Sequence, residues 1–318
     1  MKRVKYLNNR DLLAQIHASK NTYCSYVAPE DSQYDIIVPN LKKINPSAIA
    51  KARKAKAKRL TQRAWEEAKA SGDKKIKLTN CTVSPRKIDK TDLVFRVNTY
   101  DHIPMDSGRK KNPKQTSDHH AKVNFPPFQH YRLDKKGKLK CVGKSHWIGG
   151  MSNGYFSVDH GKITNSLAMM FMKLCERYGT RANWRGYTYN DEMQSQALMQ
   201  LSQIGLQFDE SKSENPFAYY TAAITNSFTR ILNIEKKNQS IRDKLHKFLL
   251  EKKIFCKIYF SPIHLTKFYQ NKIDTNYSLP NTEEISNLVL TLPLFPNMTL
   301  EEKDYLINSI DEFFEKEK

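Results

Sequence analysis

The 318-residue chain contains few cysteines and no long apolar run. Its five cysteines are scattered, odd in number and form no C-x-x-C, which excludes a disulfide scaffold and agrees with a reducing cytoplasm. No apolar stretch reaches the roughly 18 residues that cross a bilayer. The basic start, Met1–Tyr6, has no apolar region behind it. We therefore expect a cytoplasmic protein without a secretory signal or membrane contact.

Histidine and cysteine also lack any recognised metal-ligand spacing. The possible ligands are scattered over one region, and most have the character of loop or surface residues. We therefore expect no metal site. The residues considered are His102, His119, His120, Cys141 and His146.

Acidic residues are too few to balance the basic ones, with 33 Asp and Glu against 53 Lys and Arg, a net charge of +20. The excess lies in residues 1–145, which hold 33 basic and 13 acidic residues, whereas 146–239 and 240–318 are nearly neutral. Such a charge favours a polyanionic partner, because Lys and Arg release counterions when they neutralise phosphates. We predict three segments with these boundaries: an N-terminal helix plus basic insert, a helical domain and an appendage.

A helix is predicted over residues 46–71. Pro46 suits its first turn, and Gly72 follows its end. Its cations alternate with alanine and leave almost no apolar stripe, so we expect that a core can hardly hold it. It could be a phosphate-contacting arm, with Lys51, Arg53 and Lys54 among the contacts, or a solvated basic helix with no dedicated partner.

The rest of the basic insert is predicted to be mixed or irregular. Residues 92–105 alternate like a strand, and residues 131–148 can form a hairpin around Lys136-Gly137. Between them lies a loop-like stretch, 106–122, that contains Arg109-Lys110-Lys111.

Two helices are predicted in the middle segment before residue 208. The first covers 165–178 and is apolar. The second runs from about Asn190 to Gln207 and places apolar residues on one face. That apolar face consists of Met193, Ala197, Leu201 and Ile204.

A third helix begins at Asn215-Pro216, an N-cap followed by proline, and is expected to end near Asn238. Opposite its apolar side lies a stripe of an aromatic, an amide and two cations, which is the chemistry that binds single-stranded nucleic acid. A surface stripe with a half-buried tyrosine is the alternative. The apolar side is Phe217, Ile224, Phe228 and Ile231; the other stripe is Tyr219, Asn226, Arg230 and Lys237.

Residues 184–239 closely resemble the late-transcription sigma factor of T-even-like bacteriophages. The resemblance lies in Trp184–Met193, Asn215–Ile231 and Glu235–Lys237, and it extends to the N-terminal run Tyr6–Leu13. Similarity to the larger, cyanophage-type members lies in Asp92–Val97 and Asn124–Phe128.

That resemblance implies a sigma-region-2-like helical domain that binds host core RNA polymerase and opens AT-rich late promoters in an infected bacterial cell. One helix, Asp191–Leu206, would dock on the polymerase, and the next, Phe217–Lys237, would open promoter DNA. The implied polymerase-binding residues are Asp191, Glu192, Gln196, Gln200 and Gln203. The implied DNA-binding residues are Tyr219, Tyr220, Thr221, Asn226, Arg230, Lys236 and Lys237, with Lys51, Arg53 and Lys54 from the basic helix.

By the same resemblance, Tyr219 would stack on a flipped base. Flipping a base costs a few kcal/mol, and stacking and backbone contacts would have to offset that cost. One departure concerns the paired tryptophans of bacterial sigma factors, which Ala222-Ala223 replace here. The wedge at the edge of the duplex would therefore have to come from elsewhere.

The last segment resembles the C-terminal end of pyridoxal-phosphate-dependent sugar aminotransferases. The similarity lies in Tyr259–His264, Leu279–Glu283 and Leu292–Tyr305. That family's Schiff-base lysine and phosphate cup have no counterpart, so an active aminotransferase is not expected from this chain alone. The elements predicted here are helices over 240–253, 281–291 and 299–314, and a strand over 254–260.

The C-terminal run Ser309–Glu315 mixes apolar and acidic residues. It is similar to the epitope through which late phage sigma factors bind a sliding clamp. Because the aminotransferase resemblance includes these residues, an amphipathic helix that packs on its own small domain is the better explanation.

These observations lead us to expect a mainly α protein with a small α/β C-terminal appendage. The leading hypothesis is a non-enzymatic late sigma factor that needs no cofactor. Its partners would be host core RNA polymerase and promoter DNA, with a phage sliding clamp and a co-activator as further candidates. The competing hypotheses are a fragment or fusion of a sugar aminotransferase without its catalytic lysine, and a general basic nucleic-acid-binding protein.

Overall fold

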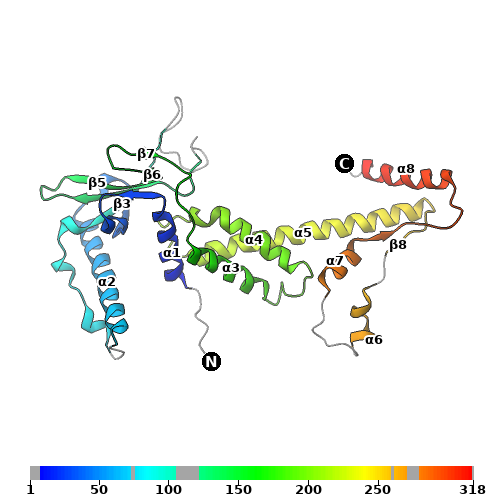
Figure 1. Cartoon of the computed structure of the whole chain (residues 1–318), viewed down its shortest axis with the longest axis horizontal. Coiled ribbons are helices and arrows are strands. Elements are labelled where there is room, and N and C mark those ends of the chain that lie inside the picture. The colour runs from blue at the N-terminus through cyan, green and yellow to red at the C-terminus, as the bar shows by residue number, and fades with distance from the viewer. Residues whose placement is uncertain (1–7, 73–75, 105–121, 259–260, 271–278, 317–318) are drawn as a thin grey trace. The chain divides into compact units, whose positions relative to one another are not determined.

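The computed structural model describes residues 8–72, 76–104, 122–258, 261–270 and 279–316. They form two compact units, whose elements are labelled in Figure 1. In the described ranges, no helix is long and apolar enough to span a bilayer. The first unit comprises Met1–Met170 and Ser202–Tyr219, and the second comprises Phe171–Leu201 and Tyr220–Lys318.

A five-stranded mixed sheet organises the first unit, in the order β1-β5-β4-β3-β2. Only the β2–β3 pair is parallel. The predicted hairpin is confirmed as β4–β5, and Gly137 takes a φ of 79° in its turn, a conformation that glycine adopts without strain. In the described residues, the predicted mixed or irregular structure of the basic insert therefore includes regular strands of this sheet. The strands are β1 Cys24–Tyr26, β2 Ile36–Val38, β3 Val94–Asn98, β4 Phe128–Leu133 and β5 Leu139–Ser145.

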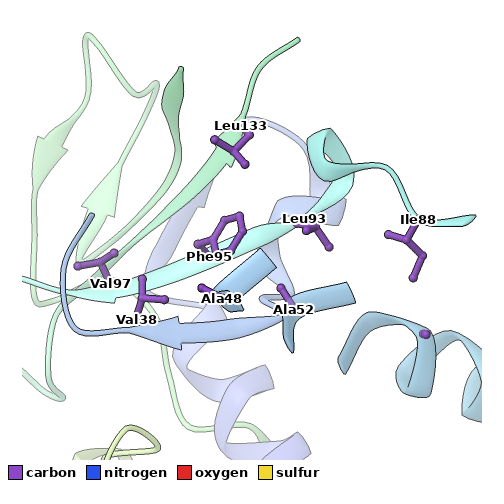
Figure 2. Packing of buried hydrophobic residues seen from close by; sticks show 9 residues of the cluster. Val38, Ala48, Ala52, Ile88, Leu93, Phe95, Val97 and Leu133 are labelled. Atoms are coloured by element: carbon purple, nitrogen blue, oxygen red, sulfur yellow. The ribbon is translucent and has the colours of Figure 1, made fainter. Parts of the chain in front are cut away.

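The basic helix α2, Pro46–Ala70, packs on this sheet through alanine. Ala48, Ala52 and Ala57 are buried in one cluster with strand residues such as Phe95. Figure 2 shows Ala48 and Ala52 beside Phe95. The helix is confirmed, but the expectation that a core can hardly hold it is wrong, because small side chains let the helix backbone approach the sheet closely.

The remaining elements of the first unit are short, except α1, Asn9–Asn21. Asn8 caps α1 by accepting a hydrogen bond from the backbone N–H of Asp11 at 2.8 Å, and Leu12 and Ile16 are fully buried. A second sheet pairs β6, Trp147–Ile148, with β7, Tyr155–Phe156. The 3₁₀ turns are Pro29–Ser32, Leu41–Lys43, Leu78–Cys81, Pro85–Lys87, Lys90–Asp92 and Gly205–Gln207.

Three longer helices follow: α3 Asn165–Gly179, α4 Asn190–Ile204 and α5 Pro216–Glu251. The apolar faces predicted for the last two are largely buried, with Met193, Ala197, Leu201, Ile224 and Phe228 at 0% exposure. In the second unit, the ring of Phe228 packs edge-on against Tyr178 and Trp184, at centroid distances of 5.2 and 5.3 Å.

Helix α5 continues to Glu251, so the predicted end near Asn238 and the separate helix over 240–253 are wrong. No proline or glycine stands between Phe217 and Glu251, and the change in overall composition at residue 240 does not interrupt the backbone hydrogen bonds.

The C-terminal elements build a small α/β part of the second unit around Leu249, Ile254, Cys256 and Leu306. The predicted strand over 254–260 is described only as β8, Lys257–Ile258, which pairs with β9, Leu290–Thr291. The helices are α6 Lys267–Gln270, α7 Pro280–Leu288 and α8 Leu300–Lys316, with a 3₁₀ turn at Ile263–Leu265.

Candidate functional site

A cavity of about 770 Å³ lies among the C-terminal elements of the second unit. Aliphatic side chains and one tyrosine dominate its wall, and a few hydroxyl groups and one imidazole are placed among them. A concave, mostly apolar site with few polar groups is the usual form of a small-molecule site. Its lining is Ser261, Pro262, Ile263, His264, Tyr269, Leu279, Thr282, Ile285, Ser286 and Val289.

The imidazole in this wall, that of His264, is held by a carboxylate. Nε2 of His264 lies 2.8 Å from Oε1 of Glu283, and the two side chains are only 8% and 11% exposed. A nearly buried His–Glu pair beside a cavity can hold or move a proton, which makes it the best candidate for chemistry in this unit.

The start of α7 fixes Glu283. The same Oε1 accepts the backbone N–H of Leu279 at 3.1 Å, while the N–H of Glu283 donates to the carbonyl of Leu279 at 3.0 Å. Pro280, in the first helical position, needs no N–H partner. The bond from the backbone N–H of Leu279 caps the start of α7 and leaves Glu283 little freedom to turn away from His264.

Helix α5 also contacts α7. Arg242 donates from Nη1 to the carbonyl of Asn287 and pairs with Asp243 at 2.6 Å. Asn287 in turn donates from Nδ2 to the carbonyl of Glu283 at 2.9 Å. These bonds connect the cavity wall to the longest helix of the chain.

The residues predicted to bind polymerase lie on one helix, α4. Asp191, Glu192 and Gln203 are exposed, and Gln196 and Gln200 are half-buried. Their binding role is untested and stays a prediction.

The residues predicted to bind DNA on α5 are divided between surface and core. Tyr220 is fully buried, with its ring 4.9 Å from that of Phe171, so it belongs to the core in this fold. Tyr219 is half-buried and packs on Phe208 at 5.5 Å, and Thr221 is half-buried. Lys236 is exposed. A shallow depression on α5 is lined by Asn226, Thr229, Arg230, Asn233, Ile234 and Lys237.

On α2, Lys51 and Lys54 are exposed, whereas Arg53 is half-buried. The Nε atom of Arg53 is buried, and no residue that the structure describes forms a hydrogen bond with it. The structure therefore places two of the three predicted phosphate contacts where a polyanion could reach them.

The histidines considered as metal ligands are not all on the surface. His146 is fully buried and His102 is half-buried, which corrects the expectation of surface and loop histidines. In the described part of the chain, no three His, Cys, Asp or Glu side chains are grouped as a metal site would require. Residues 1–7, which include Tyr6, residues 109–111, His119 and His120 lie outside the described residues.

Residues 188–311 match the DegT/DnrJ/EryC1/StrS aminotransferase family. The match covers less than half of the chain and includes α4, α5, the cavity and the His264–Glu283 pair. No solved structure matches the chain. The sequence resemblance between the C-terminal segment and sugar aminotransferases is thus supported, and it extends further toward the N-terminus than predicted.

The same match overturns the leading hypothesis. Both helices assigned to polymerase docking and promoter opening, Asp191–Leu206 and Phe217–Lys237, lie inside a region that matches an enzyme family. The expectations of a sigma factor, of promoter melting in late phage transcription, and of a protein that is not an enzyme are therefore wrong.

The cavity does not fit pyridoxal phosphate, the cofactor that this family implies. Enzymes hold that group through a lysine, with an acidic or basic partner at the pyridine nitrogen. Among the described residues, the cavity wall contains no lysine or arginine, and the nearby Glu283 already bonds His264. Lys237 and Arg230 border a depression that α5 alone lines, and they are exposed.

The sequence contained signs of this site that went unused. Pro280 followed by Glu283 is a helix-start pattern, and an acid in the first turn can bond outside its own helix. His264 has no neighbour in the sequence that marks it as buried, so only the fold reveals its partner.

Proposed function

We propose that residues 188–311 work as part of a pyridoxal-phosphate-dependent aminotransferase that transfers an amino group to a keto sugar. In this proposal, the cofactor is held outside the cavity that His264 lines. The observation that supports this most is the family match over that range. The cavity adds to it, because apolar walls with the hydroxyls of Thr282 and Ser286 suit one face of a sugar ring.

In this proposal, His264 and Glu283 act on the substrate side. Glu283 orients the imidazole at the cavity wall, where it can bind a hydroxyl group or hold a proton. The low exposure of both side chains excludes most water from this pair and strengthens its interaction with a bound polar group.

A complementation assay tests the proposal. The full chain is mixed with an aminotransferase of the same family from which the portion equivalent to residues 188–311 has been deleted. Formation of 2-oxoglutarate from glutamate is followed with a keto-sugar acceptor present. We expect turnover only in the mixture, and about a hundredfold loss or more with H264A, the usual scale for removal of a group that transfers a proton.

The matched control is Glu301→Gln, an exposed change on α8 that should leave turnover unchanged. The proposal would be contradicted if the deleted portion restores turnover to the truncated enzyme and this chain does not.

A further inference from the structure

A second cavity, of about 640 Å³, lies in the first unit beside the edge strand β2. Its walls come from α1, from Tyr34–Pro39, from Asn98 at the end of β3, and from Glu210, Ser211, Ser213 and Glu214. The proposed aminotransferase function makes no use of it. Its position is notable because a sheet edge carries backbone groups that a further strand can bond.

The pairing of β2 shows which of its backbone groups face the cavity side. β2 is the last strand of the sheet, and Val38 pairs with Val97 of β3 in parallel. Because Pro39 has no N–H, the N–H and carbonyl of Val38 form the hydrogen bonds to β3. Backbone groups alternate along a strand, so the N–H and carbonyl of Ile37 point away from β3. Within the described residues, no hydrogen bond to these outward groups is formed.

The side chains of Ile36 and Val38 belong to the core that α2 covers, which holds β2 in place. In Figure 2, Val38 lies on the strand next to the one that carries Phe95 and Val97. The free edge is therefore part of a packed sheet and is already in the extended form that a partner strand needs.

Several contacts also hold the part of the wall around Tyr34 and His17 in place. The ring of Tyr34 stacks on His17 at 5.2 Å, and the guanidinium carbon of Arg96 lies 3.9 Å from the centre of the same ring. Nε2 of His17 lies 3.3 Å from the Tyr34 hydroxyl and 3.4 Å from Oε1 of Glu210. A wall that is fixed before binding reduces the entropy that a ligand must overcome.

The charges of the lining favour a cation. It includes the carboxylates of Asp35, Glu210 and Glu214 but no lysine or arginine. Arg59 pairs with Asp35 at 2.6 Å, and Lys20 pairs with Glu210 at 2.8 Å. Glu214 is exposed and makes no ion pair with any residue in the described ranges, so one negative charge at the rim is left uncompensated.

We propose that this cavity binds an extended segment of another polypeptide, which adds as a strand to the outer edge of β2 and places a Lys or Arg side chain on Glu214. Backbone bonds to an edge give affinity in this mode, and side-chain positions give specificity. Three residues of β2 span about 10 Å, and Pro39 ends the pairing, so the added strand is short.

The test uses the full chain and fluorescein-labelled heptapeptides in which valine and threonine alternate around a central lysine. Fluorescence anisotropy measures their binding. We expect E214K to weaken binding about tenfold or more, and Glu67→Lys, an exposed change on α2, to leave it unchanged. A central glutamate in the peptide should weaken binding to a similar extent as E214K.

Peptide N-methylation identifies the backbone contribution. Methyl groups on alternate residues block one edge of a strand, so one methylated peptide should lose binding and its partner, methylated on the other set, should keep it. I37P should weaken all peptides, since it removes the outward N–H of Ile37 and fixes the backbone φ at this position. Equal loss with both methylated peptides, no binding at 1 mM peptide, or the same affinity for E214K and E67K would each overturn the proposal.

Discussion

Nζ of Lys20 lies 2.8 Å from Oε2 of Glu210, and the two side chains are only 2% and 10% exposed. Lys20 also donates to the carbonyl of Phe208 at 2.7 Å. Burial lowers the pKa of Lys20, and Glu210 opposes that shift. Burial alone would raise the pKa of Glu210, but Lys20 and Arg96 outweigh it and lower the pKa overall. Within the first unit, this pair ties α1 to the segment after α4.

Substitution of Lys20 by methionine tests this ion pair. We expect a loss of about 3–5 kcal/mol in the free energy of unfolding of the first unit, because Glu210 is left buried without its main cation. Urea unfolding followed by circular dichroism measures it. The control is Arg10→Ala, which removes the exposed Arg10–Glu66 pair and should cost less than about 1 kcal/mol. Equal effects of the two changes would contradict this prediction.

Local signals predicted much of the secondary structure. Pro46 and Asn215-Pro216 marked helix starts, and Lys136-Gly137 marked the hairpin. The contacts of α2 were missed because alanine contributes little to an apolar stripe, although it allows the closest approach to a sheet. Lys20–Glu210 and His264–Glu283 join residues that are far apart in sequence, so spacing contains no information about either pair.

Acid should destabilise the first unit through its buried histidines. Burial lowers the pKa of His146 to about 3 and that of His102 to about 4, from an ordinary value of 6.5. Between pH 6.5 and 4, the unfolded chain therefore binds protons that the folded unit does not. The contribution of these histidines to the free energy of unfolding is fully present above pH 6.5. Below pH 6.5 it falls by about 1.4 kcal/mol per pH unit for each histidine, until the pH reaches the pKa of that histidine in the folded unit.

Urea midpoints at pH 7 and pH 5 measure this dependence. The variant His102→Gln should reduce the loss between these two values by about 2 kcal/mol, since one titrating group is gone. A wild-type midpoint that stays constant over this range would show that these imidazoles are accessible to protons in the folded state.

The contact between α2 and the sheet should not tolerate a larger side chain. Ala52 is fully buried between the helix and the sheet, whereas Ala55, three positions along the same helix, is exposed. We expect A52L to lower the free energy of unfolding by about 1–3 kcal/mol through overpacking, and A55L to change it by less than about 0.5 kcal/mol. Thermal unfolding of the two variants is a direct comparison, and a stable A52L would mean that α2 does not pack closely.

Glu283 should matter for the structure of the cavity as well as for chemistry. In Glu283→Ala, His264 loses its carboxylate partner and the start of α7 loses a cap. We therefore expect the free energy of unfolding of the second unit to fall by about 1–3 kcal/mol. Hydrogen exchange of the Leu279 and Glu283 amides should accelerate more than exchange in α8. Glu284→Ala, one residue along, is the control, and similar exchange in both variants would contradict a structural role for the pair.

The continuity of α5 across residue 240 can be tested with proline. Ser240 is exposed on the helix, so its side chain contributes little and a substitution there acts through the backbone. S240P should lower the free energy of unfolding by about 3 kcal/mol, because proline removes a helical hydrogen bond and clashes with the preceding turn. S240A should leave the free energy of unfolding unchanged or raise it slightly. Circular dichroism at 222 nm and urea unfolding measure both. If a break already separated two helices near Asn238, S240P would be almost silent, since proline is tolerated in a first turn.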